Sequence, residues 1–454
     1  MPSLATVTDV ARDIGRRCAD TASLITHATR EENAIPYIGA HPWDPTSPSH
    51  GYPALIFLFA ALDETFPDEG WDSIAHRMLE ALITELHAKG HTNCSAFSGL
   101  VGMTLSVLAA SRGRTRYAGL LSDCMQLIVD RITGEYLEPI RDGLEKGKSV
   151  SPLTWDVIVG VSGVLPCLLH CTDQDNVRAC CHTIVGALSE LVVQQNMYEG
   201  KAVPGFYIPS HLLLHTEQRE RYAPGCIDTG MAHGISGMLA SLTFAALQLP
   251  SVADTARSAV GILAGWLVDA FNAKYDVKEG CWPSRLVLQE NGTYASFDSF
   301  HRDGWCYGAP GIGRSLFVAN TLLNDEEIGV VVDSVFASLS ERLPEGTGLV
   351  CPSLCHGWAG LLATLQSMHL DTGKDEFAQM TRFTADRILS CYDVSRPFGF
   401  ATLSSQLGEP EVWIDNPGLL DGVSGIVLAL LAYEQGRRPL WKGLFAIEGA
   451  HNVS

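Results

Sequence analysis

Residues 305–319, WCYGAPGIGRSLFVA, contain the pattern on which the whole chain is built. In Gly308-Ala309-Pro310-Gly311, two glycines three positions apart come directly before an apolar run. A helix that is apolar nearly all round is a buried helix. Glycines at its start permit a close approach of neighbouring backbone and an unusual φ angle. The stretch therefore predicts a buried helix that begins at Gly308.

The same pattern of a glycine, two residues and a glycine or small residue recurs along the chain, which points to a repeat architecture. The seven first glycines are Gly51, Gly99, Gly160, Gly234, Gly308, Gly357 and Gly422. They lie 48 to 74 residues apart, which leaves room for one more helix in each interval. Stretches with helical periodicity and a polar face fill five intervals: 71–88, 176–195, 254–271, 325–343 and 375–389. The first repeat departs from the pattern, with Ala54 in place of the second glycine.

Each repeat thus predicts one inner, buried helix and one outer, amphipathic helix. Seven such hairpins around a shared core suggest a ring in an all-α protein, with the glycine loops gathered at one end. A loop face on a rigid helical scaffold is a common place for a functional site. Residues 1–454 are expected to form a single domain. Within it, two long connections, 196–228 and 274–303, are expected to be non-helical, the second with short strands and a hairpin at Asn291-Gly292.

Composition excludes several functional classes. The net charge is −20, from 51 acidic and 31 basic residues, which disfavours binding to nucleic acid or to anionic lipid. The N-terminus has no apolar signal segment, and no run of apolar residues is long enough for an integral membrane segment. The thirteen cysteines are scattered, as in a cytosolic protein with reduced thiols. Cys167, Cys180 and Cys181 are expected to be buried as small apolar side chains.

Two of the helix starts carry metal-ligand side chains. Cys306 precedes Gly308, and Cys355 and His356 precede Gly357, so neighbouring repeats offer two thiolates and one imidazole at similar positions. Thiolate and imidazole ligands favour Zn²⁺ over magnesium or calcium. Three protein ligands with one open position are typical of a catalytic zinc site, because structural zinc sites are usually closed. The sequence therefore predicts a catalytic zinc site held by Cys306, Cys355 and His356.

Two further side chains are candidates for acid–base chemistry. His233 comes directly before Gly234, so it is expected at the same loop face, either as a general acid/base or as a structural histidine. Asp156 lies among apolar residues four positions before Gly160 and needs a partner. That partner is either His233 or a loop amide.

Three more residues flank these motifs. Arg302 is expected either to stabilise developing negative charge or to pair with Asp303 or Asp156. Tyr307 is either a packing residue or a proton donor. Asp421 precedes the seventh motif and is expected to cap its helix.

Four motifs together resemble the lanthionine synthetase C-like family, the cyclases of lanthipeptide biosynthesis. They are DTGMAHGISG (228–237), WCYGAPG (305–311), LCHGWAG (354–360) and LLDGVSG (419–425). The resemblance covers essentially the whole chain and implies an α/α toroid, a double ring of about seven inner and seven outer helices that holds a catalytic zinc. It assigns Cys306, Cys355 and His356 as metal ligands. It also implies that His233 and Asp156 are the acid/base candidates, with Arg302 and Tyr307 close to the metal.

The implied activity is that of a lantibiotic cyclase. Such an enzyme adds cysteine thiols of a dehydrated precursor peptide, a leader plus a core, to dehydroalanine or dehydrobutyrine in the same peptide. The product is a lanthionine or methyllanthionine thioether ring. Zinc lowers the pKa of a bound thiol; His233 is then the candidate donor of the α-proton, and Arg302 the group that steadies the enolate oxygen.

The resemblance also implies partners. The first repeat begins near residue 50, so we expect a stand-alone cytoplasmic cyclase with a separate dehydratase and a transporter, peripheral to the membrane only through them. The connection 196–228 is aromatic-rich and is expected to contribute to leader binding. Two alternatives stay open: a relative that adds glutathione to dehydrated residues, and a zinc-stabilised scaffold without catalysis.

Overall fold

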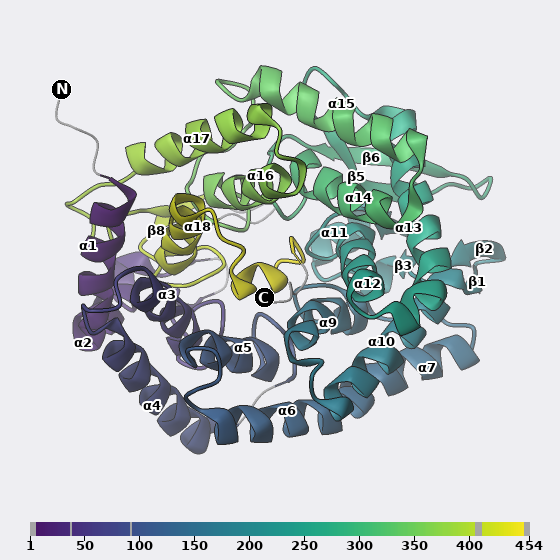
Figure 1. Ribbon diagram of the computed structural model, residues 1–454. Coiled ribbons are helices and arrows are strands. Elements are labelled where there is room, and N and C mark those ends of the chain that lie inside the picture. The colour runs from purple at the N-terminus through teal and green to yellow at the C-terminus, as the bar shows by residue number, and fades with distance from the viewer. Residues whose placement is uncertain (1–5, 37–38, 91–92, 405–410, 449–454) are drawn as a thin grey trace. The chain divides into compact units, whose positions relative to one another are not determined.

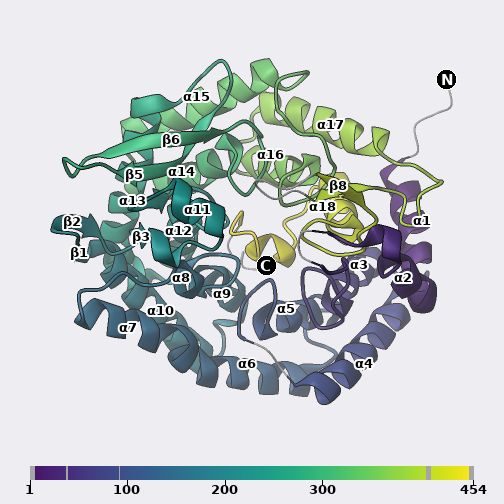
Figure 2. The same cartoon turned by 180° about the vertical axis from the view of Figure 1, so that it is seen from behind.

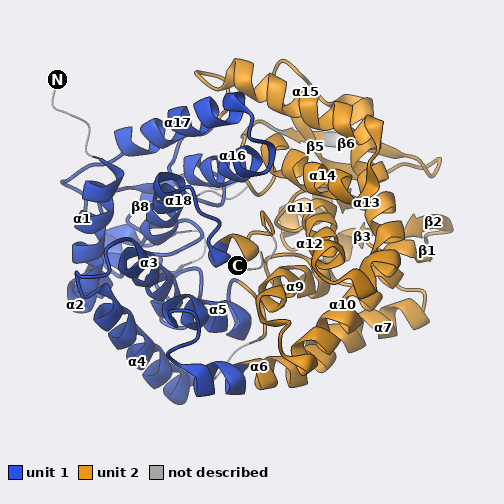
Figure 3. Ribbon diagram, viewed as in Figure 1, with its two compact units in different colours: residues 1–93, 97–124, 349–441 blue, residues 94–96, 125–348, 442–454 orange. Residues whose placement is uncertain are grey.

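The computed structural model of the chain describes all residues except 1–5, 37–38, 91–92, 405–410 and 449–454 (Figure 1). The residues cluster into two compact units, which Figure 3 shows in blue and orange. Unit 1 contains residues 1–93, 97–124 and 349–441, and unit 2 contains residues 94–96, 125–348 and 442–454. Both units are mainly helical, as the sequence predicted. Helix α6 (Ala118–Ile132) begins in unit 1 and ends in unit 2.

Unit 1 is built on four buried helices that pack in the order α16, α18, α3, α5. Outer helix α17 packs on α16, α4 packs on α3, and α1 packs on α18, so the first helix of the chain is held by the last. The helices are α1 (Val7–Ala19), α2 (Thr21–Ala28), α3 (Tyr52–Thr65), α4 (Trp71–Lys89), α5 (Leu100–Ala110), α16 (Trp358–Thr372), α17 (Asp375–Ser390) and α18 (Val423–Gln435). Strands β7 (Thr402–Ser404) and β8 (Val412–Ile414) form a two-stranded antiparallel sheet.

Unit 2 repeats this arrangement with buried helices α9, α12 and α14, each packed on the next. Outer helices α10, α13 and α15 follow them in sequence and also contact one another in that order. The helices are α7 (Glu138–Glu145), α8 (Pro152–Trp155), α9 (Val161–Leu168), α10 (Asp175–Val193), α11 (Thr216–Arg221), α12 (Ile235–Gln248), α13 (Ala253–Lys274), α14 (Ala309–Leu323) and α15 (Glu326–Arg342).

All seven predicted glycines start a buried helix. Gly51, Gly99, Gly160, Gly234, Gly308, Gly357 and Gly422 are the N-cap residues of α3, α5, α9, α12, α14, α16 and α18. Their backbone is extended, with φ between −136° and −76°, so none of the seven uses the unusual φ angle that a glycine permits. The five predicted outer helices are also present, as α4, α10, α13, α15 and α17.

Close backbone approach is the reason for the glycines. A Cβ atom on Gly163 would lie 1.9 Å from the carbonyl oxygen of Val157, and one on Gly237 would lie 2.2 Å from that of Met231. Both contacts are far inside van der Waals distance, and the opposing atom is rigid backbone. Only glycine therefore lets the loop fold back onto the first turn of its helix.

Within each unit, backbone hydrogen bonds join the loops that precede the buried helices. In unit 2, Val157 N donates to Ala232 O at 3.2 Å, and Met231 N donates to Cys306 O at 2.8 Å. In unit 1, Cys355 N donates to Leu420 O at 2.9 Å, and the chain of contacts continues through Ser49 to Phe97. The glycine loops of a unit therefore gather on one face of that unit, as expected.

The two long connections of unit 2 build a four-stranded antiparallel sheet in the order β3-β4-β5-β6. It consists of β3 (Ile208–Pro209), β4 (Gly225–Asp228), β5 (Trp282–Leu288) and β6 (Tyr294–Phe300), beside the separate pair β1 (Gln195–Tyr198) and β2 (Lys201–Pro204). The hairpin at Asn291-Gly292 joins β5 to β6, and both strands contact α13 (Figure 2). The first connection also contains the short helix α11, so the prediction that it is non-helical was wrong there.

Candidate functional site

A candidate metal centre lies in unit 1, where the loops before α16 and α18 meet. Potential ligand atoms of Cys355, His356 and Asp421 all lie within 4.8 Å of one another. The backbone bond from Cys355 to Leu420 holds the two loops together. All three side chains are partly exposed, so a ligand can reach them. The structure thus brings together two of the three predicted metal ligands, Cys355 and His356.

The orientation of His356 suits a metal ligand. Its Nε2 atom lies 3.0 Å from the carbonyl oxygen of Leu403, which can only accept a hydrogen bond. A proton on Nε2 leaves a lone pair on Nδ1, and metal-binding histidines are usually oriented in this way. Nδ1 faces Oδ1 of Asp421 at 3.4 Å, and this oxygen is buried without a hydrogen-bond partner. Two acceptor atoms that face each other beside a thiol fit a cation.

Sequence reasoning did not assign Asp421 to this site. It was expected to cap α18, but Gly422 is the N-cap, no side chain caps this helix, and the Asp421 carboxylate turns to His356 instead. Cys351 was also missed: its thiol is buried in the same loop and contacts the His356 side chain. Residue spacing alone offered no signal for either contact.

Cys306 belongs to unit 2 and keeps its predicted place two residues before the N-cap of α14. Its side chain is buried, and its carbonyl oxygen accepts hydrogen bonds from Met231 and Ala232 of the loop before α12. The neighbouring Trp305 is anchored by a 2.8 Å bond from its indole to the carbonyl oxygen of Phe445. The Cys306 loop is therefore held by hydrogen bonds within its unit, and the part of Cys306 in the metal site stays a prediction.

The acid–base candidates His233 and Asp156 are in direct contact in unit 2. Nδ1 of His233 lies 2.7 Å from Oδ2 of Asp156, which is fully buried. The other carboxylate oxygen, Oδ1, accepts hydrogen bonds from the backbone amides of Val159 and Gly160 at 2.7 and 2.8 Å. Both partners that the sequence left open for Asp156, the histidine and the loop amides, are present at once.

The charges around His233 favour its protonated form. Burial on its own would lower the pKa of this imidazole, but the hydrogen bond and the charge of Asp156, together with the charge of Asp228, raise the pKa above 6.5. With Nδ1 engaged by Asp156, Nε2 is the nitrogen left to exchange a proton with a ligand. The pair therefore has the chemistry of a general acid near neutral pH.

His233 lines a pocket of about 180 Å³. One part of its wall is apolar and the other is polar, as in many small-molecule and peptide sites. The lining residues are Pro152, Ile208, Leu213, Leu214, His215, Gln218, Asp228, His233, Arg285 and Tyr307. Tyr307 lines this pocket with His233, and its expected closeness to the metal stays a prediction. Asp228 and Arg285 are functional candidates that the sequence did not reveal.

Arg302 lies in the loop between β6 and α14, half-buried. It is not among the described residues that line the His233 pocket. Its neighbour Asp303 is bound by Arg342 through both carboxylate oxygens, at 2.6 and 3.2 Å. The arginine that does line the pocket with His233 is Arg285.

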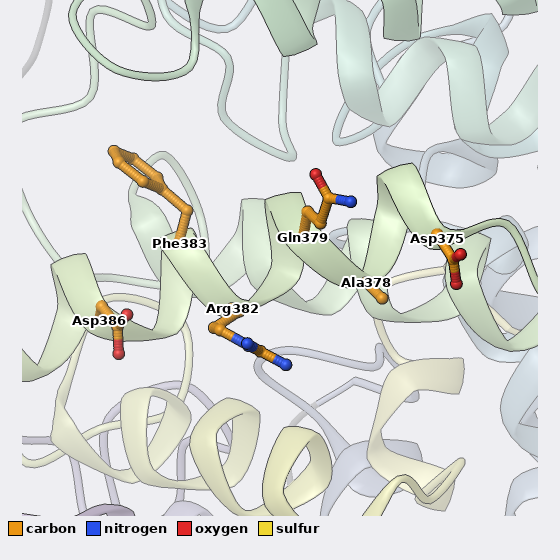
Figure 4. Close-up of a pocket in the computed structure, with 6 residues that line it drawn as sticks. All are labelled: Asp375, Ala378, Gln379, Arg382, Phe383 and Asp386. Atoms are coloured by element: carbon orange, nitrogen blue, oxygen red, sulfur yellow. The ribbon is translucent and has the colours of Figure 1, made fainter.

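A second hollow, of about 530 Å³, runs along the outer helix α17 (Figure 4). Its lining residues are Asp375, Ala378, Gln379, Arg382, Phe383 and Asp386. Figure 4 shows that they all project from one helix and do not converge on a point. None of them is a cysteine or a histidine, so the hollow has neither the thiol nor the imidazole that the predicted chemistry needs.

Comparison with known proteins adds the family. The model of the lanthionine synthetase C-like protein family matches residues 42–446. The chain belongs to the lanthionine synthetase C-like family. Nisin biosynthesis protein NisC of Lactococcus lactis subsp. lactis is 26% identical to it over 393 residues, which are 85% of each chain.

A solved structure named nisin cyclase matches this lanthionine synthetase C-like protein with a TM-score of 0.73 and 22% identity, over 97% of each chain. The likeness confirms the fold class that the sequence predicted, the α/α toroid. None of the thirteen cysteines, all of which lie in the described part of the chain, forms a disulfide. In the described part of the chain, every helix is too short or too polar to span a lipid bilayer.

Proposed function

We propose that this protein is a lanthipeptide cyclase that depends on zinc. It would add a cysteine thiol of a dehydrated peptide to a dehydroalanine or dehydrobutyrine of the same peptide. Membership of the lanthionine synthetase C-like family supports the reaction class, as does the similarity to NisC, a nisin biosynthesis protein. The observation that carries the proposal is the meeting of Cys355, His356 and Asp421, since a thiol substrate calls for a soft-ligand metal site.

Cys355 and His356 would hold the zinc, with Cys306 as the proposed third ligand. The zinc would lower the pKa of the substrate thiol. The thiolate sulfur forms a bond to the β-carbon, and the electrons of the carbon–carbon double bond move toward the adjacent carbonyl. His233, protonated through its contact with Asp156, delivers a proton to the α-carbon from Nε2. The thiol proton replaces the one that His233 gives up, so the reaction is a net addition without oxidation or reduction.

Other parts of the proposal concern the loop before α14 and the long connection 196–228. Arg302 is the candidate for stabilising the enolate oxygen. The connection 196–228 provides Ile208, Leu213, Leu214 and His215 to the pocket wall, which supports a role in holding the peptide. We expect a cytoplasmic enzyme that receives its peptide from a separate dehydratase and passes the product to a transporter.

The test is to incubate the zinc-loaded protein with a dehydrated precursor peptide of the nisin type. Ring closure consumes one peptide thiol per ring without a change in mass, so alkylation followed by mass spectrometry counts the rings. An unchanged number of alkylated cysteines contradicts the proposal. A parallel reaction with glutathione identifies a glutathione-adding enzyme by the added mass. The His233→Ala variant separates catalysis from a scaffold, which would bind zinc and peptide equally well without this imidazole.

A further inference from the structure

Arg285 is an arginine buried in the wall of the His233 pocket. It lies on β5 directly across from Asp228 of β4, and its side chain is 7% exposed. Nη2 lies 2.9 Å from Oδ2 of Asp228, and Nη1 donates to the carbonyl oxygen of Ser284 at 2.9 Å. The register of two neighbouring strands therefore sets this ion pair.

The same guanidinium holds Tyr307. Nη2 of Arg285 donates to the phenol oxygen at 3.1 Å, and the centre of the guanidinium lies 4.9 Å from the centroid of the ring. The phenol in turn donates its proton to Oδ2 of Asp228 at 3.2 Å. A Cβ atom on Gly230 would lie 2.5 Å from the ring, so the tyrosine rests against bare backbone. Ring and hydroxyl are both fixed.

These contacts favour a packing role for Tyr307 over a role as proton donor. Its only hydroxyl proton is directed to Asp228, and burial raises the pKa of the phenol well above 10. A tyrosine in this state is a poor acid toward a substrate. Its ring forms pocket wall, and its position depends on two charged side chains that also border His233.

We infer that Arg285 and Asp228 are a positioning pair for the cyclisation proposed above: they lock Tyr307 into the wall of the His233 pocket and so set how the dehydrated residue meets His233. The inference rests on the proposed function. The two residues also balance each other's charge, because the carboxylate of Asp228 and the guanidinium of Arg285 lie side by side in the pocket wall. His233 therefore faces an ion pair and not a single unbalanced charge. Neither residue needs to touch the reacting atoms.

A purely structural ion pair is the competing explanation, and a double-mutant cycle separates the two. The variants are Arg285→Gln, Tyr307→Phe and their combination, with kcat and KM measured on a dehydrated peptide. We expect Arg285→Gln to lower kcat at least tenfold and to change KM less than threefold. We expect the combined variant to be no slower than Arg285→Gln alone, because both changes release the same ring.

Two further variants keep the test valid if Arg285→Gln does not fold. Arg285→Lys retains the positive charge but lacks the planar guanidinium that bonds Asp228 and Tyr307 at once, so it should recover part of the lost rate. Asp228→Asn with Arg285→Met leaves no unpaired buried charge, and an asparagine at this position can still accept the hydrogen bond from Gly230 N. This double variant should fold with bound zinc and show the rate of Arg285→Gln.

The control is Arg112→Gln, which removes a different arginine–aspartate pair, the bidentate one with Asp63 of unit 1. It should lower the melting temperature and leave kcat unchanged. The inference fails if Arg285→Gln cyclises at the wild-type rate, or if the losses from Arg285→Gln and Tyr307→Phe multiply. An inactive wild-type protein instead overturns the proposed function and the inference with it, so the two failures are distinct.

Discussion

Oδ2 of Asp156 lies 2.7 Å from Nδ1 of His233, while Oδ1 of the same carboxylate accepts hydrogen bonds from the two amides that lead into α9. One buried side chain thus ties the imidazole to the start of a buried helix. The arrangement fixes the orientation of the ring and favours its charged form. It also means that the charge of the carboxylate and its hydrogen bonds to the loop amides can be separated by substitution.

The Asp156→Asn variant should lower the rate of cyclisation and shift its pH dependence. An asparagine can still accept the hydrogen bonds from Val159 and Gly160, but without the carboxylate charge the effect of burial dominates and the pKa of His233 falls. Activity that needs protonated His233 then declines at a lower pH than in the wild type, with a loss of about 10²-fold or more at neutral pH. The measurement is kcat against pH, and an unchanged alkaline limb would speak against His233 as the acid.

The same pair makes stability depend on pH. The pKa of His233 is raised in the folded protein, so its contact with Asp156 stabilises the fold below the unfolded pKa of about 6.5. That contribution is lost as the pH rises through the raised pKa. Melting curves of the wild type should therefore show a decline over this range that is reduced in Asp156→Asn. If the melting temperatures of the wild type and of Asp156→Asn change with pH in the same way, the assignment of a protonated His233 is contradicted.

The metal site gives a third prediction. Replacing Cys355 by serine or His356 by alanine should abolish stoichiometric zinc, because each removes a ligand atom. Asp421→Asn should weaken zinc binding by about 10–100-fold, as expected for a carboxylate that ligates or orients at such a site. Metal content and competition with a chelator measure these effects, and Cys124→Ser is the control for loss of a partly exposed thiol. Full zinc affinity in Asp421→Asn would show that the carboxylate takes no part.

The glycine pattern predicted the buried helices correctly because close approach of a carbonyl to a helix start admits only one residue type. Gly163 and Gly237 show this directly, each with a carbonyl oxygen about 2 Å from where a Cβ would stand. Cys355 and His356 were also recognisable as ligand-type residues, since residue type and spacing are written in the sequence, while their binding of a metal stays a prediction. The extended φ angles could not be predicted. The sequence shows that a glycine is needed, but not whether it is needed for close backbone approach or for an unusual φ angle.

Contacts between strands and loops that are far apart in the chain could not be predicted from the sequence. Asp228 and Arg285 meet through the register of β4 and β5, which no local pattern encodes. Asp421 was expected to be a helix cap because aspartate before an apolar run usually is one, yet its carboxylate lies beside His356. Both misses are cases in which tertiary packing, rather than local preference, decides where a charged side chain goes.

Substitution of the second glycine of a repeat should be strongly destabilising. Gly163→Ala places a methyl group 1.9 Å from Val157 O, so the loop or the helix must shift, at a cost of about 1–3 kcal/mol or more. Gly186→Ala in the middle of α10 is the matched control, since the added methyl group would have no neighbouring atom within 4 Å outside its own helix backbone. It should stabilise the helix by roughly 0.5–1 kcal/mol. Denaturant unfolding of both variants measures the contrast.

A buried ion pair near the C-terminus gives the last prediction. Nζ of Lys442 lies 3.2 Å from Oε1 of Glu448, with both side chains almost completely buried. Lys442→Met should cost about 3–5 kcal/mol, because it removes a buried positive charge from beside a buried carboxylate, whereas adding Glu448→Leu should recover most of the loss. Between these two residues, Phe445 packs on Trp305 and accepts the bond from its indole, so the single variant should also loosen the Cys306 loop. Chelator competition should then show weaker zinc binding in Lys442→Met than in the double variant; equal affinity in both would mean that the C-terminal segment stabilises unit 2 without supporting the metal site.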